Sequence, residues 1–173
     1  MSTFVIRAST AEDVVEIARI YQHYVLHSTS TFEIEPPAPE EMARRRAAIL
    51  ELGMPYLVAE ANGRVIGYAY ANAYRPRRAY CFTVEDSIYV DPAAARQGCG
   101  GVLLAALIAE CERGPWRQMI AVIGDSANAA SIALHERSGF RRVGTLERVG
   151  FKFERWVDSV LMQRELGVKK EHG

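Results

Sequence analysis

The feature that most limits how this chain can fold is an apolar strand that runs into a glycine-rich turn and then a helix. Ile88-Tyr89-Val90 is followed by Asp91-Pro92, which ends the strand, and by Arg96-Gln97-Gly98-Cys99-Gly100-Gly101. An apolar face at helical spacing then continues to Cys111. Glycines at a helix start let backbone N–H groups approach an anion, and the helix dipole adds partial positive charge there. The segment therefore favours a phosphate or pyrophosphate site, with a plain turn that needs glycine as the alternative.

Two other phosphate-binding motifs are excluded. The glycines are not followed by Lys-Ser or Lys-Thr, which excludes a P-loop. Their spacing is G-x-G-G, which differs from the G-x-G-x-x-G of dinucleotide-binding proteins.

Hydrophobic periodicity and turn residues predict the secondary structure of the rest of the 173-residue chain. Thr10 and Asp13 form a capping-box-like helix start, and Asn62-Gly63 between two apolar runs is a strong hairpin signal. We expect strands over 5–7, 56–61, 65–73, 80–90, 119–123, 141–146 and 156–164, helices over 11–26, 40–52, 98–111 and 129–138, and a frayed tail over 168–173. This order predicts one α/β domain, a mixed sheet with helices on both faces.

Composition narrows the class of protein further. With 21 basic and 21 acidic side chains, the net charge is zero, which argues against a nucleic-acid or membrane-surface partner. The chain has no long apolar run and no signal-peptide pattern at its start, so we expect a cytoplasmic protein. Three cysteines without C-x-x-C spacing predict small buried side chains, not a disulfide framework or zinc site. His23 and His27 lack a third ligand, so no metal is expected.

A second segment strengthens the case for a ligand site. A strand ends at Gly124, Asn128 precedes a short helix, and that helix places Ser131 and His135 on one face. Asn128 could simply cap the helix, and His135 could be a buried structural histidine.

The two segments together resemble the GNAT N-acetyltransferases, which take acetyl-CoA. The first resembles their pyrophosphate loop, R/Q-x-x-G-x-G/A, although Ala95 stands where Arg or Gln is usual; the second, Asn128 to Phe140, resembles their later coenzyme segment. Across residues 4–166 the chain is similar to phosphinothricin and methionine sulfoximine acetyltransferases, through Ser30-Thr31-Phe32-Glu33, the run 83–90 and Val149-Gly150-Phe151-Lys152. The resemblance implies a mostly antiparallel sheet and a homodimer.

The resemblance also implies coenzyme contacts. Those residues would be Ile88, Tyr89, Val90, Arg96, Gln97, Gly98, Cys99, Gly100, Gly101, Asn128, Ser131 and His135. The backbone of 88–90 would pair with the pantetheine arm, and an N–H near Val90 would polarise the thioester carbonyl.

Glu85 and His135 occupy the positions at which the resemblance implies catalysis. Glu85 would accept a proton from the amine, directly or through water; the alternatives are a salt bridge or an anchor for the substrate ammonium. His135 would either protonate the leaving thiolate or only contact the coenzyme.

Three arginines in four residues predict where an acidic acceptor binds, with a solvated turn as the alternative. By resemblance, Arg75 and Arg77 would hold a carboxylate or phosphinate. The full predicted acceptor set is Phe32, Arg75, Pro76, Arg77, Tyr80, Glu85, Asp86, Ser87 and Gly124. The expected partner is a small amino acid analogue. The alternatives are another amine (another amino acid, polyamine, aminoglycoside or protein N-terminus) or a non-catalytic module that senses coenzyme A.

Overall fold

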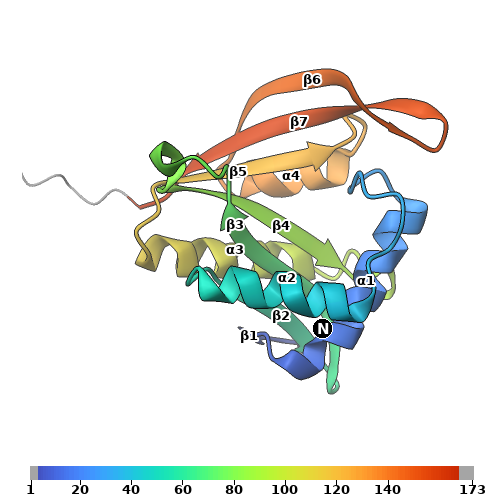
Figure 1. The fold of residues 1–173 in the computed structure, drawn as a ribbon, viewed down its shortest axis with the longest axis vertical. Helices are drawn as coiled ribbons and strands as arrows, with labels where there is room; N and C mark the ends of the chain where they lie inside the picture. The colour runs from blue at the N-terminus through green and yellow to red at the C-terminus, as the bar shows by residue number, and fades with distance from the viewer. Residues whose placement is uncertain (1–3, 168–173) are drawn as a thin grey trace, which may run out of the picture.

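The computed structural model describes residues 4–167, which form one seven-stranded sheet with helices on both faces (Figure 1). The strands are β1 (Val5–Ala8), β2 (Tyr56–Ala61), β3 (Arg64–Ala73), β4 (Thr83–Val90), β5 (Gln118–Gly124), β6 (Arg141–Lys152) and β7 (Arg155–Glu165). The helices are α1 (Val14–His27), α2 (Pro39–Glu51), α3 (Cys99–Arg113) and α4 (Ala129–Arg137). The predicted order of elements is confirmed, and the predicted tail lies outside the described residues.

The sheet is mixed but mostly antiparallel, as expected. Its strand order is β1-β2-β3-β4-β5-β7-β6, and of its pairs only β4 with β5 is parallel. Helices α1 and α2 cover one face, and α3 and α4 cover the other (Figure 1).

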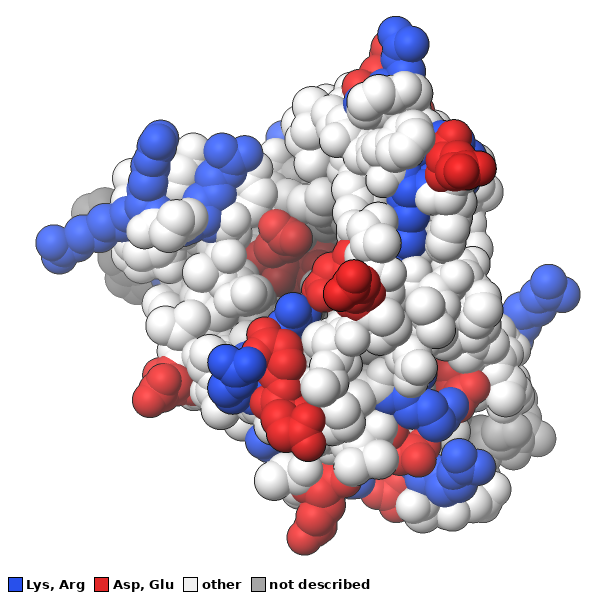
Figure 2. Space-filling view, turned by 45° about the vertical axis from the view of Figure 1, so that its right-hand side comes forward, with Lys and Arg blue, Asp and Glu red and all other residues white. Residues whose placement is uncertain are grey.

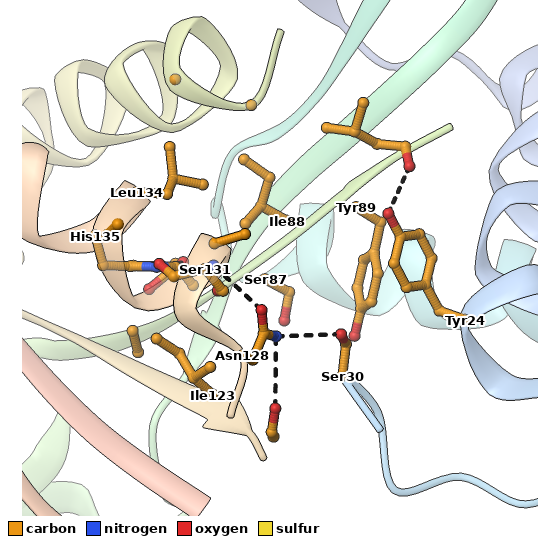
Figure 3. A pocket seen from close by; sticks show the side chains of 18 of the residues that line it. Tyr24, Ser30, Ser87, Ile88, Tyr89, Ile123, Asn128, Ser131, Leu134 and His135 are labelled. Atoms are coloured by element: carbon orange, nitrogen blue, oxygen red, sulfur yellow. Dashed lines mark hydrogen bonds and ion pairs between the residues drawn. The ribbon is translucent and has the colours of Figure 1, made fainter. Parts of the chain in front are cut away.

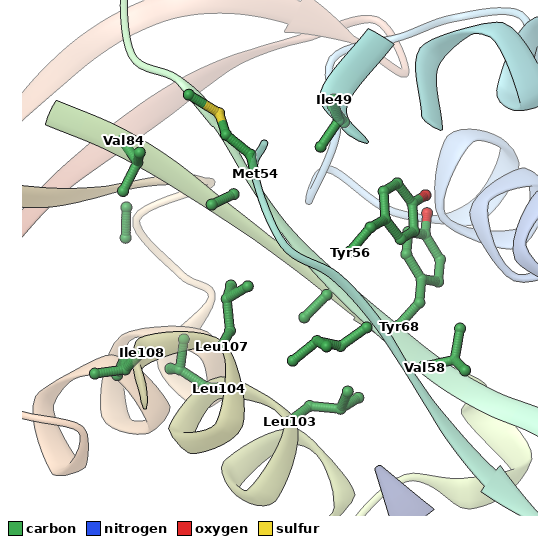
Figure 4. Packing of buried hydrophobic residues seen from close by; sticks show 14 of the residues in the cluster. Ile49, Met54, Tyr56, Val58, Tyr68, Val84, Leu103, Leu104, Leu107 and Ile108 are labelled. Atoms are coloured by element: carbon green, nitrogen blue, oxygen red, sulfur yellow. The ribbon is translucent and has the colours of Figure 1, made fainter. Parts of the chain in front are cut away.

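Alternation along the strands directs side chains to these two layers. On β3, a Cβ at Gly67 would touch Leu103 of α3, whereas the next residue, Tyr68, points to the opposite face and stacks on Tyr89. Figure 4 shows Leu103, Leu104 and Leu107 beneath the strands on one side, with Tyr56 and Tyr68 on the other. Full burial of each leucine contributes about 1.5–3 kcal/mol, so this packing holds α3 firmly against the sheet.

The sheet splits between β4 and β5, and this split creates the site. The parallel pairing ends at Asp86 opposite Ala121. Beyond that point β4 still pairs with β3 up to Val90, and β5 still pairs with β7 up to Gly124. The C-terminal halves of β4 and β5 therefore separate, and each presents an edge to the gap.

Several predicted boundaries were wrong. Tyr80 does not begin a strand, because residues Arg78–Tyr80 form a 3-10 turn in which Tyr80 N–H donates to Arg77 O at 2.9 Å, and β4 starts at Thr83. The helix predicted over 11–26 begins with a 3-10 turn, Ala11–Asp13. Cys99 and Cys111 are buried as expected, but Cys81 is exposed.

The last two strands are longer than predicted, because β6 extends to Lys152 and β7 begins at Arg155. Gly150 and Lys152 are the buried residues at that end of β6, while Phe151 is exposed. A strand that buries glycine and lysine does not show the usual apolar alternation, so its sequence does not read as a strand.

Candidate active site

A cleft of about 810 Å³ lies where β4 and β5 separate, and it runs from one face of the sheet to the other (Figure 3). That volume is within the usual range for small-molecule sites. Most of the predicted site residues line it: Phe32, Glu85, Asp86, Ser87, Ile88, Tyr89, Val90, Arg96, Gly98, Cys99, Gly100, Gly101, Gly124, Asn128, Ser131 and His135. The structure thus brings two distant segments of the chain to one site.

On the α3–α4 face, the cleft is bounded by the start of α3. Gly98 caps the helix with φ of +81° and contributes no side chain, and Val102 N–H is hydrogen-bonded to Gly98 O at 3.3 Å. The first amides of the helix, those of Cys99, Gly100 and Gly101, have no carbonyl one turn earlier within the helix. They form an N–H-rich helix end at the cleft, which suits a pyrophosphate.

The turn before α3 places its two polar side chains differently. Arg96 adopts φ of +64° and lines the cleft, where its charge adds to that of the helix end. Gln97 does not line the cleft; its Nε2 approaches Ala93 O at 3.5 Å, so its coenzyme role stays a prediction.

Along β4, alternate backbone groups point into the split. Asp91 N–H donates to Ile66 O of β3 at 2.8 Å, so residues of the same parity pair with β3. Ile88 and Val90 therefore direct their backbone groups toward the gap. Tyr24 Oη donates to Val90 O at 2.6 Å (Figure 3), and the N–H groups of Ile88 and Val90 face the cleft, where they can pair with a ligand.

Asn128 caps α4 and also joins the walls of the cleft. Its Oδ1 accepts from Ser131 N–H at 3.2 Å, which confirms the capping interpretation. Its Nδ2 approaches Ser30 Oγ at 3.4 Å and Gly124 O at 3.5 Å (Figure 3). This side chain thereby links the end of β5, the start of α4 and the segment after α1.

His135 is buried and has a partner at each ring nitrogen. Nδ1 lies 2.8 Å from Ser131 O, and Nε2 lies 3.0 Å from Asp86 Oδ2. Because a carbonyl only accepts, Nδ1 carries a hydrogen, and one proton is shared between Nε2 and Asp86. Burial lowers the pKa of His135, but the hydrogen bond and charge of Asp86 outweigh it and raise that pKa above 6.5.

Glu85 lies at the point where β4 and β5 separate. Its side chain is on the same face as Tyr89, toward α1, which is opposite to the face of Asp86 and His135. Burial, with a smaller effect from the charge of Asp86, raises the pKa of Glu85 to about 7. Such a carboxylate can exchange a proton near neutral pH.

The arginine-rich loop lies outside the cleft lining. Arg75, Pro76 and Arg77 are exposed, and Tyr80 packs edge-on against Tyr74 at 5.6 Å. Arg75 is still close enough for its charge to lower the pKa of Glu85. Figure 2 shows a group of basic side chains at the upper left of the view and acidic side chains around a central hollow. The acceptor-binding roles of this loop stay predictions.

Several residues that line the cleft were not among the predicted site residues, and four of them lie on helices α1 and α4. Tyr24 comes from α1, whereas Ala130, Leu134 and Arg137 form one stripe of α4. The i, i+4, i+7 spacing of that stripe is a signal that could have found it. Arg137 adds a second cation on the α3–α4 side of the cleft.

His23 and His27 are exposed on α1, as expected for surface residues. Residues 4–167 contain no group of three His, Cys, Asp or Glu side chains arranged to hold a metal ion. They also contain no helix with the length and apolar character needed to cross a bilayer.

Comparison with known proteins agrees with this geometry. Residues 6–161 match the acetyltransferase (GNAT) domain family, and the chain belongs to that family. It is 54% identical over 161 residues to phosphinothricin N-acetyltransferase of Alcaligenes faecalis, covering 93% of this chain and 82% of that protein.

Two further relatives are similar over almost their full length. L-methionine sulfoximine/L-methionine sulfone acetyltransferase of Salmonella typhimurium is 39% identical, covering 93% of this chain and 94% of that protein. The crystal structure of the Sinorhizobium meliloti phosphinothricin acetyltransferase in complex with AcCoA superposes with a TM-score of 0.93 at 46% identity, covering 96% and 90% of the two chains.

Proposed function

We propose that this acetyltransferase moves the acetyl group of acetyl-CoA to the α-amine of a small amino acid analogue of the phosphinothricin, methionine sulfoximine or methionine sulfone type. The observation that carries the proposal is the cleft through the sheet, with an open helix N-terminus on one face and Glu85 on the other. The names of the relatives point to the same substrates.

The proposed mechanism assigns each face of the sheet one substrate. The pyrophosphate binds at Gly98–Gly101, and the pantetheine arm pairs with the exposed edge of β4. The N–H of Val90 polarises the thioester carbonyl. The acceptor enters from the α1–α2 face, where Glu85 takes one ammonium proton directly or through water and passes it to solvent. The nitrogen then attacks the carbonyl carbon, the C–S bond breaks to release the thiolate, and the second nitrogen proton is lost to solvent.

The leaving thiolate also needs a proton. Direct donation by His135 conflicts with the hydrogen bonds that already engage both ring nitrogens. We therefore propose that His135 contacts the coenzyme as part of the cleft wall and that solvent protonates the thiolate.

The test follows free thiol release from acetyl-CoA with a panel of acceptors. The panel contains phosphinothricin, methionine sulfoximine, methionine sulfone, common amino acids, a polyamine and an aminoglycoside. We expect turnover with the first three. Turnover only with the polyamine or aminoglycoside would contradict the acceptor class, and coenzyme binding without any turnover would favour a sensing module.

We also propose that the protein is a homodimer. The β6–β7 ribbon exposes large apolar side chains that water disfavours, including Phe151 and Trp156, which are 57% and 60% exposed and pack edge-on at 5.1 Å. Light scattering should give about twice the 19.3 kDa chain mass, and Trp156→Ser should shift it toward the monomer. A monomeric wild-type protein at micromolar concentration would contradict this proposal.

A cytoplasmic location, and the absence of nucleic-acid, membrane and metal partners, belong to the same proposal. The balanced charge of the sequence supports the absence of nucleic-acid and membrane-surface partners.

A further inference from the structure

Residues 28–32, which follow α1 and are called here the docked loop, are held against the C-terminal half of the chain. Thr29 Oγ1 donates to Asp125 Oδ2 at 3.0 Å, and Ser30 Oγ lies 3.4 Å from Asn128 Nδ2. Ser30, Thr31 and Phe32 line the cleft. Contacts with Asp125 and Asn128 thus help to hold at the site a loop that is far away in sequence from β5 and α4.

Lys152 makes two of the hydrogen bonds that hold this loop. Its Nζ donates to Ser28 O at 2.7 Å and to Thr31 O at 2.8 Å, and the residue is only 3% exposed. Burying an ammonium group is costly unless its donors are satisfied, and here two carbonyls of the docked loop satisfy two of them. Burial lowers the pKa of Lys152, and the charge of Glu33 opposes that effect.

Two glycines leave room for the same loop. A Cβ at Gly150 would lie 2.4 Å from Phe32 Cε2, so the ring packs directly on the backbone of β6. A Cβ at Gly124 would lie 2.1 Å from Thr29 O and 3.2 Å from the Phe32 ring. The docked loop therefore packs on one surface, which is formed by Gly124, Gly150 and Lys152. This surface determines the position of the Phe32 ring.

The docked loop lies on the acceptor side of the cleft, not the coenzyme side. It leaves α1, which packs on the face that carries Tyr89 and Glu85, and Phe32 remains 39% exposed at the cleft mouth. The helix end suited to pyrophosphate lies on the opposite face. A displacement of this loop would change the space beside Glu85 and leave the start of α3 unchanged.

We propose that Lys152 is a positioning residue for the acceptor: it holds the docked loop on Gly124 and Gly150, so that Phe32 forms the wall beside the acceptor side chain. This inference rests on the proposed function. It assigns a role to a buried lysine that donates to the docked loop and to two glycines at which a Cβ would collide with that loop.

The variants that test it are Lys152→Met, which keeps the side-chain length but removes the donors, and Gly150→Ala, which displaces the ring. Gly150→Ala keeps the test valid if Lys152→Met fails to fold. The partly exposed Phe32 ring can swing outward to make room for the added methyl group, so this variant should still fold. Matched controls lie on the same strand. Gly144→Ala has no atom within 4 Å of the added Cβ, and Arg142→Met removes an exposed cation that donates a hydrogen bond to Thr145 Oγ1 at 2.7 Å.

We expect Lys152→Met and Gly150→Ala each to raise the KM for phosphinothricin about tenfold, with the KM for acetyl-CoA changed less than twofold. The controls should match wild type in both constants. A purely structural lysine would instead lower the thermal midpoint and the active fraction and leave the acceptor KM unchanged, and that result would overturn the inference.

A double-mutant cycle tests whether Lys152 acts through Phe32. Phe32→Ala already removes the wall, so adding Lys152→Met should change the acceptor KM less than twofold further. Fully additive effects would overturn the inference. If wild-type protein acetylates none of the amino acid analogues, the proposed function and this inference both fail; if wild type is active and the acceptor KM values do not move, only the inference fails.

Discussion

Nε2 of His135 lies 3.0 Å from Oδ2 of Asp86, and the two buried side chains join α4 to β4 at the point where the sheet splits. Because Nδ1 already donates to Ser131 O, the pair holds a single proton between ring and carboxylate. The second carboxylate oxygen, Oδ1, is buried and has no hydrogen-bond partner among the described residues. The pair is thus a buried link whose strength depends on that proton.

We predict that His135→Leu destabilises the protein by about 3–5 kcal/mol, because it leaves the Asp86 carboxylate buried without a partner. Asp86→Asn should cost less, because an amide N–H can donate to Nε2 of a neutral ring. Urea unfolding at constant pH measures both free energies. Equal losses for the two variants would contradict the shared-proton arrangement.

The same pair predicts how stability changes with pH. A histidine whose pKa is raised on folding contributes stability below 6.5 and loses that contribution as pH rises through the folded pKa. The stability advantage of wild type over Asp86→Asn should therefore shrink between pH 6 and pH 9. His27→Asn, at an exposed site on α1, serves as the control and should leave that pH dependence unchanged.

Replacing Glu85 should lower the activity of the protein and raise its stability. Its pKa of about 7 in the folded protein exceeds 4.5, so the folded state binds the proton more tightly and ionised Glu85 destabilises it above pH 7. Glu85→Gln should lower kcat about 10²–10⁴-fold, yet raise the unfolding free energy at pH 8 by about 1–3 kcal/mol.

The measurements for Glu85 are a pH–rate profile and urea unfolding at pH 5 and pH 8. Wild-type kcat/KM should rise with pH through about 7, and the variant should lack that limb. Unchanged turnover in Glu85→Gln would show that Glu85 is not the base.

Gly98 and Gly53 allow a matched test of the coenzyme loop. Both adopt left-handed φ values, +81° and +70°, and a Cβ at either would meet no atom within 4 Å. Alanine at each should cost about 1–2 kcal/mol through backbone strain alone. Only Gly98→Ala should also raise the KM for acetyl-CoA, about tenfold, because relaxation of its φ would turn the amides at the start of α3. An equal effect from Gly53→Ala would mean that the KM change reflects stability.

Much of the fold could be predicted from sequence because its signals are local. Asn62-Gly63 predicts the hairpin, and helical spacing predicts α1 to α4. The start of β4 could not be predicted, because the apolar run from Tyr80 looks continuous while hydrogen bonds from Tyr80 and Cys81 form a 3-10 turn.

Motifs indicated most of the residues that line the cleft, and what the motifs could not indicate depends on tertiary contacts. Asp86 and His135 are 49 residues apart, and their hydrogen bond has no sequence signature. Lys152 is 121 residues from Thr31, whose carbonyl it binds, and a lysine in a strand ordinarily indicates a solvated face. The separation of β4 from β5 depends on how the strands pair, and no residue pattern in the sequence indicates it.

Arg75 predicts an effect on both binding and pH. Its charge lowers the pKa of Glu85, so Arg75→Ala should move the acidic limb of the pH–rate profile to higher pH. If the guanidinium also holds an acidic group of the acceptor, the loss of that charged hydrogen bond should raise the acceptor KM by about 10- to 100-fold, equivalent to about 1.5–3 kcal/mol. Arg78→Ala, in the same exposed loop, is the control and should change neither quantity. If the pH limb shifts while the acceptor KM stays unchanged, the role of Arg75 is limited to lowering the pKa of Glu85. If both variants have equal effects, the loop acts only through its overall positive charge. In that case 0.5 M salt would remove the effect of either variant, because salt screens exposed charges.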